Sequence, residues 1–283
     1  GPTTDDGSIV GWSWEFGDTL TSTSGPTVTH AYGAAGTYQV RLVVTDEDGA
    51  QDDVTQEVVV TDTPGPAVLA SDAFDRTVTG GLGTANVGGP WTVLQSSGAR
   101  QSVTPNVAAM TLPAANTNTG SFLGGVSATS VDVRTSFTVD VAPTGNGTYV
   151  YVTGRRVSNN NEYRARVRLL ADGRVALSLS RLTSATTPIE SFPGGEVIVP
   201  GLIYTVGQDL NVRVQVSGTG TTQIGASVWP AGGTEPATRS MVRSDTTAVL
   251  QAAGSVGLLV HRPSGTTAAT TVRFTSFTVN AGP

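Results

Sequence analysis

The sequence predicts an all-β protein with two domains, and its composition and charge distribution carry this prediction. Threonine (43), valine (38) and glycine (35) make up about two fifths of the 283 residues, whereas glutamate (7) and methionine (2) are scarce and lysine is absent. Threonine and valine suit pleated strands and glycine suits tight turns, while the missing residue types are those that favour helices. An all-helical protein is therefore excluded.

Charge divides the chain into two parts. Residues 1–62 carry 11 acidic residues against a single arginine, whereas residues 63–283 carry 11 acidic residues against 15 arginines. Between these parts, the sequence T-D-T-P-G-P-A has two prolines, a glycine and no hydrophobic periodicity, as is typical of a short, stiff linker. We therefore expect a first domain at residues 1–62, a linker at 63–68 and a second domain at 69–283.

The same composition excludes several classes of protein. No stretch approaches the roughly 18 apolar residues of a membrane-spanning helix, so we expect no membrane insertion. The absence of cysteine excludes a disulfide framework, cysteine-ligated zinc and thiol catalysis. The arginines are spread over the second part and form no concentrated basic patch, so we expect no nucleic-acid partner. The chain opens at Gly1 without a signal-peptide pattern, and we expect a mature or excised piece of a longer chain.

Three strands are expected in the first domain, at residues 10–16, 36–46 and 51–60. The middle strand alternates cleanly between apolar and polar residues, which is typical of a half-buried strand. It breaks at T-D-E-D-G (residues 45–49), a sequence that favours a hairpin turn into the third strand.

Four motifs of this domain occur in order: W-E-F-G-D at residues 14–18, H-A-Y at 30–32, G-T-Y-Q-V at 36–40 and T-D-E-D-G at 45–49. Residues 1–62 thereby resemble the PKD domain, a small immunoglobulin-like β-sandwich of bacterial cell-surface proteins and secreted degradative enzymes. The resemblance implies that Trp14 is a buried core residue. A PKD domain has one or two strands before the turn represented here by Asp6 and Gly7, so we expect this copy to lack its first strand.

After the linker, eleven short strand candidates without a convincing helix predict a β-sandwich or jelly roll. They are residues 71–74, 90–94, 107–112, 131–141, 148–156, 162–170, 174–182, 210–217, 224–229, 255–261 and 271–279. The motifs D-A-F-D-R (72–76), G-G-P-W-T (88–92), G-R-R (154–156), E-Y-R-A-R-V-R (162–168) and V-R-F (272–274) resemble the concanavalin A-like lectin/glucanase sandwich, as fused to PKD repeats in secreted actinobacterial proteins. That superfamily mixes lectins, hydrolases, lyases and structural modules, so the resemblance implies a larger jelly-roll fold and leaves function open.

The most informative pattern of the second domain is an arginine strip. Arg164, Arg166 and Arg168 alternate with apolar residues, so their guanidinium groups project from one face of a strand about 7 Å apart. Arg213, which stands between two valines on another strand, is expected to point the same way.

The register of the following hairpin decides what lies beside this strip. A two-residue loop would place Leu177 opposite Arg168 and mix apolar with charged groups. A three-residue loop that ends at Gly173, with this glycine in the left-handed region, pairs Arg166 with Ser178 and keeps one face apolar throughout. We expect the second register, which makes the strip a shallow groove beside small residues.

Two interpretations of the strip stay open. It is either a solvated sheet face whose arginines pair with local carboxylates, or a groove for an acidic polysaccharide whose uronate carboxylates or sulfates the guanidinium groups bind. Tyr149 and Tyr151, two residues apart on a nearby strand, are either a sugar-stacking platform or cross-strand packing residues.

Calcium is the one metal that the sequence suggests, since hard oxygen ligands are those that calcium takes. The candidate ligands are Asp6, Asp46 and Asp48 in the first domain and Asp72 and Asp75 in the second. The alternative is that these residues build turns, because no D-x-[DN]-x-[DN]-G loop occurs.

No catalytic motif accompanies these features. The chain has no G-x-S-x-G or H-E-x-x-H sequence, and it lacks both the E-x-D-x-x-E strand of jelly-roll glucanases and the motifs of the alginate-lyase branch. We therefore predict a non-catalytic, extracellular protein that binds carbohydrate at the bacterial cell surface, with the PKD domain as a spacer. Two alternatives remain: a surface-layer or filament subunit that self-associates head to tail through its charge split and strand complementation, and an accessory module of a polysaccharide-degrading enzyme.

Overall fold

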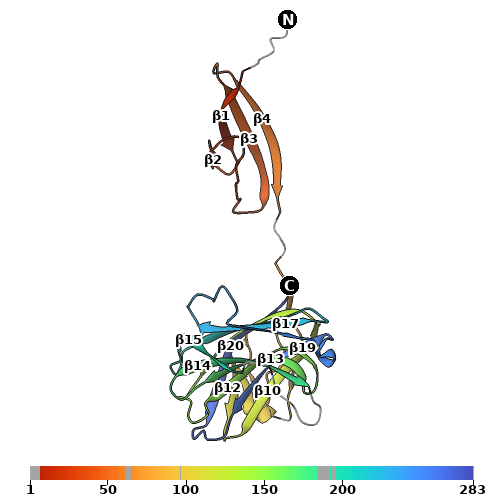
Figure 1. Ribbon diagram of the computed structural model, residues 1–283. Coiled ribbons are helices and arrows are strands. Elements are labelled where there is room, and N and C mark those ends of the chain that lie inside the picture. The colour runs from red at the N-terminus through yellow and green to blue at the C-terminus, as the bar shows by residue number, and fades with distance from the viewer. Residues whose placement is uncertain (1–6, 62–64, 96, 184–191, 193–194, 283) are drawn as a thin grey trace. The chain divides into compact units, whose positions relative to one another are not determined.

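The computed structural model describes residues 7–61, 65–95, 97–183, 192 and 195–282. These residues form two compact units, one that ends at Gly65 and one that begins at Pro66. Both units consist of antiparallel strands, which confirms the all-β prediction (Figure 1). Within the described ranges the helices are two 3-10 turns, η1 (Gly98–Arg100) and η2 (Ala248–Leu250), and no helix there is long and apolar enough to cross a membrane.

The N-terminal unit is a four-stranded sheet in the order β2-β1-β3-β4. Its strands are β1 (Ile9–Glu15), β2 (Thr21–Ser22), β3 (Gly36–Asp46) and β4 (Gln51–Val60), so the three predicted strands are present. In the part of the chain that the structure describes, these strands make one sheet. Trp14, expected to be a buried core residue, is partly exposed, and its indole N–H donates to the backbone oxygen of Gly25 at 3.0 Å.

Two of the sequence motifs meet in an aromatic stack within this unit. The rings of Phe16 and His30 lie parallel with centroids 3.9 Å apart, and Tyr32 meets His30 edge-on at 4.7 Å. His30 Nε2 lies 2.8 Å from Asp18 Oδ2. These contacts explain why the W-E-F-G-D and H-A-Y segments occur together.

The C-terminal unit is a sandwich of two antiparallel sheets, as predicted. The first has seven strands in the order β15 (Val197–Ile203), β14 (Arg174–Thr183), β13 (Asn161–Leu169), β12 (Thr148–Ser158), β19 (Gly254–Arg262), β10 (Thr117–Ala128) and β7 (Trp91–Val93). The second has nine: β18 (Met241–Asp245), β17 (Thr222–Pro230), β16 (Leu210–Ser217), β11 (Val131–Val139), β20 (Thr270–Ala281), β9 (Val107–Leu112), β8 (Gln101–Thr104) and β6 (Val78–Thr79), with β5 (Val68–Asp72) paired to β20.

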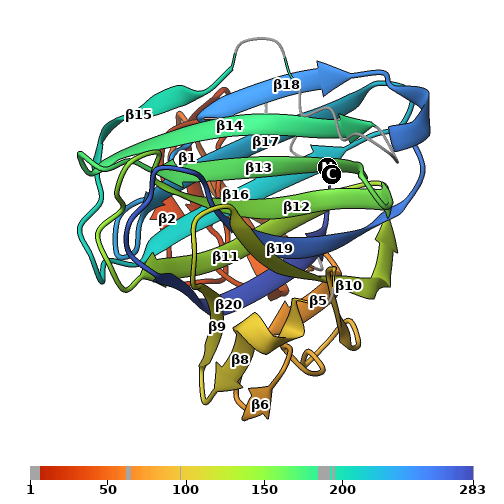
Figure 2. The same cartoon turned by 90° about the horizontal axis from the view of Figure 1, so that it is seen from below.

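The apolar core lies between these two sheets, which Figure 2 shows as stacked layers. Strands of both sheets alternate, with apolar side chains inward and polar side chains outward. Buried inward residues include Ala165, Val167 and Leu169 of β13 and Val212, Val214 and Val216 of β16. The intervening residues of these strands, among them the arginines, therefore face away from the core.

The hairpin between β13 and β14 has the predicted three-residue loop. Arg166 pairs with Ser178 and Val167 pairs with Leu177. Gly173 has a φ of +83° and donates its N–H to the backbone oxygen of Leu170 at 3.0 Å. Because only glycine adopts this conformation without strain, the glycine fixes the loop length and hence the face on which the arginines lie.

A fully buried cation joins the two sheets at one end of the sandwich. The guanidinium of Arg155 on β12 donates to the backbone oxygens of Thr129, Gly218 (2.8 Å) and Leu250 (3.0 Å) and to Thr222 Oγ1 (3.0 Å). These acceptors lie in the β10–β11 and β16–β17 connections, in η2 and at the start of β17. Burial lowers the pKa of Arg155 from its ordinary value, and the ring of carbonyl dipoles compensates for the lost hydration.

Replacing Arg155 by methionine should destabilise the C-terminal unit by about 2–4 kcal/mol, because several buried oxygens lose their donor. The free energy of unfolding from urea titration measures this. The control is Arg174→Met, since Arg174 is half-exposed and pairs with Asp172 at 2.7 Å on the surface, where the expected loss is below about 0.5 kcal/mol. Equal losses in the two variants would contradict the role assigned to Arg155.

Candidate functional site

The outer face of the seven-stranded sheet brings together the arginine strip and the two predicted tyrosines. β12 and β13 are neighbours, and Tyr149 pairs with Arg168 while Tyr151 pairs with Arg166. Arg164 continues the row one step further along β13. Residues opposite one another in a ladder share a face, so these five side chains form one surface, here called the arginine–tyrosine face.

Guanidinium groups and aromatic rings interdigitate on this face. The Cζ atom of Arg164 lies 4.1 Å from the ring centroid of Tyr151, and those of Arg166 and Arg168 lie 5.1 Å and 5.6 Å from that of Tyr149. These are cation–π distances, and they hold the arginines close to the sheet. Tyr151 is only 5% exposed and serves as packing, whereas Tyr149 keeps part of its ring at the surface.

Two glutamates that the sequence did not identify as site residues pair with the strip. Glu162 Oε1 lies 3.1 Å from Arg164, and its Oε2 lies 3.6 Å from Arg156. Glu196 contacts both of the other strip arginines. Among the described residues, the three arginines of the strip and the neighbouring Arg156 thus pair with two glutamates.

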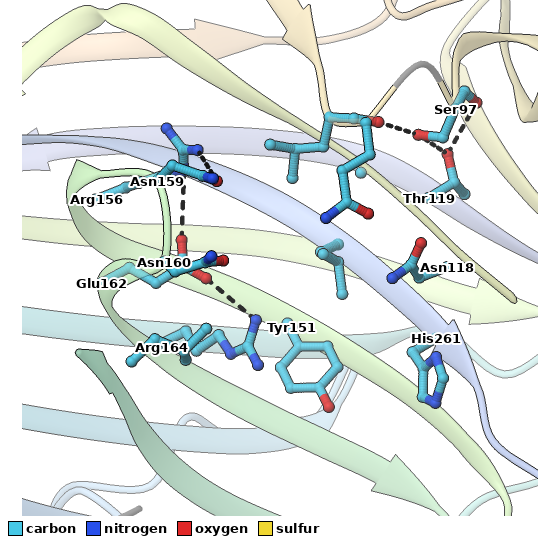
Figure 3. A pocket seen from close by; sticks show the side chains of 15 residues that line it. Ser97, Asn118, Thr119, Tyr151, Arg156, Asn159, Asn160, Glu162, Arg164 and His261 are labelled. Carbon is cyan, nitrogen blue, oxygen red and sulfur yellow. Dashed lines mark hydrogen bonds and ion pairs between the residues drawn. The ribbon is translucent and has the colours of Figure 1, made fainter. Parts of the chain in front are cut away.

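A pocket opens where β10, β12, β13 and β19 lie side by side, next to the arginine–tyrosine face (Figure 3). Its cavity volume is about 280 Å³, slightly below the roughly 300–1,000 Å³ of ligand clefts. Figure 3 shows Tyr151, Arg164 and Glu162 on one side of it and His261 on another. Its other polar lining residues include Asn118, Asn159 and Asn160.

Tyr151 and Arg164 were expected from the sequence, but His261 and the asparagines of this pocket could not be assigned from sequence motifs. His261 pairs with Tyr149 across β12 and β19, with ring centroids 5.7 Å apart. The two residues lie 112 positions apart in the chain, so no local pattern links them. Amide, imidazole, guanidinium and phenol groups around one hollow are suited to hydrogen-bonding a polar ligand and not to burying an apolar one.

A second hollow lies at the other side of the strip, towards β14. Its lining residues are Arg166, Ser178, Leu179, Ser180, Phe192, Gly195 and Glu196. Ser178 and Ser180 are the small residues that the predicted register places beside the arginines. The shallow groove expected from sequence is therefore bounded by two hollows.

Arg213 does not belong to this face, and the prediction that it points the same way is wrong. It lies on β16, in the nine-stranded sheet, between inward-facing Val212 and Val214. Its guanidinium therefore projects from the opposite outer surface of the sandwich. There its Nε donates to the Asp132 carboxylate at 2.8 and 2.9 Å. Alternation within one strand shows which residues share a face, but not to which sheet the strand belongs.

Glu235 joins Arg213 to two further arginines on that surface. Its carboxylate accepts hydrogen bonds from Arg213 at 2.5 Å, Arg134 at 2.6 Å and Arg239 at 3.0 Å. Partial burial opposes ionisation of Glu235, but these three donors outweigh it and lower its pKa to about 2. The network thereby fastens the loop that carries Glu235 to the nine-stranded sheet.

The predicted calcium ligands of the C-terminal unit have other roles in the structure. The Asp72 carboxylate accepts two hydrogen bonds from Arg76 at 2.7 Å, one from the Trp91 indole at 2.7 Å and one from the Phe74 N–H at 3.0 Å. Asp75 accepts from the side-chain amide of Asn86. Because both Asp72 oxygens point at donors and a guanidinium already balances the charge, the geometry favours a structural ion pair over a cation site.

In the N-terminal unit, Asp46 builds the β3–β4 turn. Its Oδ1 accepts from the backbone N–H groups of Asp48 at 3.0 Å and Ala50 at 2.8 Å. This is the turn role that the sequence left as the alternative to calcium. Asp6 lies outside the described residues. Among those that are described, no group of three or more His, Cys, Asp or Glu residues is placed to hold a metal ion.

Comparison with known proteins identifies the N-terminal unit. Residues 1–61 match the family model of the PKD domain, which confirms the resemblance seen in the motifs. A microbial collagenase of Vibrio alginolyticus is 42% identical over 80 residues, which are 28% of this chain and 10% of the collagenase. The chain thus spans only about a tenth of the length of this curated relative.

Solved structures align with part of this chain. The alginate lyase Aly36B aligns with a TM-score of 0.47 and 12% identity, over 76% of this chain and 97% of that chain. A legume lectin-like domain from Entamoeba histolytica aligns with a TM-score of 0.45 and 9% identity, over 68% of this chain and 90% of that chain.

The titration of Glu235 predicts a loss of stability in acid. Its folded pKa of about 2 lies below its ordinary value of 4.5, so the carboxylate contributes stability that is fully present above pH 4.5 and is lost as the pH falls towards 2. Glu235→Gln should therefore lose less stability than the wild type between pH 4.5 and 2. Urea midpoints measured across this range test it, and curves that run parallel for the two proteins would contradict it.

Proposed function

We propose that this chain is an extracellular, non-catalytic module that binds an anionic polysaccharide at the arginine–tyrosine face, with the PKD domain as a spacer. The observation that carries the proposal is the row of Arg164, Arg166 and Arg168 interleaved with Tyr149 and Tyr151 between two hollows. The arginine strip was recognisable from sequence, and the structure adds the pocket residues beside it.

The chemistry of the face supports this class of ligand. Planar guanidinium groups form directional hydrogen bonds with carboxylate and sulfate oxygens, and arginine keeps its charge at any physiological pH. The exposed part of the Tyr149 ring provides an apolar surface for the C–H face of a sugar. Asn118, Asn159 and Asn160 line the adjoining pocket with amides that both donate and accept, as sugar hydroxyls require.

The carboxylates of the face support a binding role over glycoside hydrolysis. Hydrolysis requires one carboxyl group to protonate the leaving oxygen and a second to act as base or nucleophile. Glu162 and Glu196 are both engaged by arginines of the same surface. Neither glutamate is therefore available as the general acid that would protonate the leaving oxygen of a glycosidic bond.

A structural role is the second candidate, and an exposed sheet edge favours it. Within the described residues β4 is an edge strand of the N-terminal unit, and it exposes Val54 and Val59 by 60% and 62%. Such an edge can accept a strand from another copy, and the acidic first and basic second parts of the chain favour head-to-tail contact. Light scattering at low and high salt tests this candidate, and a monomer under both conditions would contradict it.

A third candidate is an accessory module of a longer secreted enzyme. The PKD match to a microbial collagenase supports it, because that relative carries the same kind of domain within a much longer chain. The arginine–tyrosine face would then hold the enzyme on its polymer.

Affinity electrophoresis in gels that contain polygalacturonate, with neutral dextran as the reference, tests the main proposal. We expect salt-sensitive retention by polygalacturonate only, and about a tenfold loss of affinity in Arg164→Ala or Arg166→Ala, because each removes one charge-assisted hydrogen bond. Arg273→Ala is the control. Arg273 lies on β20 of the other sheet, and its guanidinium pairs with the Asp140 carboxylate at 3.4 Å.

Three results would contradict this proposal. Equal retention by dextran would exclude recognition of the anionic groups. Unchanged affinity in both strip variants would place binding elsewhere. New reducing ends or unsaturated uronate after incubation with the polymer would overturn its non-catalytic part.

A further inference from the structure

The hollow beside β14 is lined by one carboxylate, that of Glu196. Glu196 Oε1 lies 3.0 Å from Arg168 Nη1, and its Oε2 lies 3.4 Å from Arg166 Nη2. One carboxylate thus bridges two guanidinium groups with one oxygen each. A uronate carboxylate or a sulfate ester would use the same two contacts.

Among the described residues, the segment that supplies Glu196 is joined to the sheet by a short stretch of strand pairing. Glu196 directly precedes β15, the edge strand, which pairs with β14 at three positions and with a register shift between them. Two large apolar side chains of this strand, Ile198 and Ile203, are 40% and 55% exposed. Leu202, towards the far end of β15, is buried in the core, whereas Val197 and Ile198 beside Glu196 are 36% and 40% exposed. The end of the strand that carries Glu196 is therefore its less buried end, and moving this carboxylate away from the arginines disturbs few apolar contacts.

Ser178 supplies a second, independent observation at the same place. It lies opposite Arg166 in the β13–β14 ladder and lines the hollow, yet it is 4% exposed. Its Oγ has no hydrogen-bond partner among the described residues. A buried hydroxyl without a partner is costly and unusual, and Glu196 leaves this donor unused.

We propose that this hollow is an anion subsite in which Glu196 stands in for the carboxylate or sulfate ester of a polysaccharide and moves out when the polymer binds. The incoming group takes over the contacts to Arg166 and Arg168 and accepts the hydrogen bond of Ser178. This inference rests on the proposed function and adds a residue that opposes binding. Because the ligand must displace Glu196, the subsite selects for strongly anionic substituents.

The decisive variant is Glu196→Gln, which keeps the size of the side chain and removes its charge. Its affinity for polygalacturonate, a carboxylate polymer, and for dextran sulfate, a sulfate-ester polymer, is compared with that of the wild type at fixed salt. We expect about tenfold tighter binding, and the polymer that gains more identifies the preferred anion. Glu235→Gln is the matched control, because its carboxylate is also shared between arginines but lies on the opposite sheet, and it should bind as the wild type does.

Ser178→Ala tests the second half of the subsite. The hydroxyl has no partner in the free protein, so its removal should leave stability unchanged or slightly higher. Combined with Glu196→Gln, it should lower the affinity roughly threefold to tenfold relative to Glu196→Gln alone. A measurable loss of stability in Ser178→Ala, or no change in affinity, would contradict its assignment as a ligand donor.

A probe without any polymer separates this inference from the proposed function. In thermal unfolding, sodium sulfate should stabilise Glu196→Gln more than sodium chloride does at equal ionic strength, and it should not do so for Glu235→Gln. If the wild type binds polymer but Glu196→Gln binds no more tightly, the subsite is overturned and the proposed function stands. If no protein binds polymer while sulfate stabilises Glu196→Gln specifically, the subsite stands and the polysaccharide function is overturned. If neither occurs, both are overturned.

Discussion

The register of β13 between its two neighbours is the constraint on which the rest of the C-terminal unit depends. Successive side chains of a strand alternate between faces, so a slip by one residue would turn Arg164, Arg166 and Arg168 into the core and expose the apolar set. The cost of burying three guanidinium groups without partners far exceeds the stability of a domain. Gly173 and the hairpin loop therefore specify the surface chemistry of the sheet as well as its folding.

The arginines face outward close to one another, and two kinds of contact offset the repulsion between their positive charges. Neighbouring like charges on one strand repel, and aromatic rings from β12 between them offer π faces that attract each cation. The two glutamates pair with the same arginines. The guanidinium groups of the face are thus held in place by neighbouring rings and carboxylates.

Much of this surface could be predicted from sequence, because its elements are local. The strip, the hairpin register and the tyrosines follow from alternation and from one glycine. Glu196 and His261 could not be predicted, since Glu196 reaches the face from the connection before β15, 28 residues beyond Arg168, and His261 reaches it from β19. The prediction that Arg213 points the same way as the strip was wrong because long-range pairing decides to which sheet a strand belongs. Trp14 differs from its expected burial because a motif specifies a position in a family fold, whereas exposure depends on what else packs there.

Arg155 restricts which connections of this sandwich can change in length. The backbone oxygens that it binds belong to the β10–β11 and β16–β17 connections and to η2, and each must keep its length and path to reach the same guanidinium. Insertions there would break the set, whereas the β19–β20 connection contributes no acceptor to it. New loops, and with them new specificities, are therefore tolerated in that connection and excluded from the end of the sandwich that Arg155 ties together.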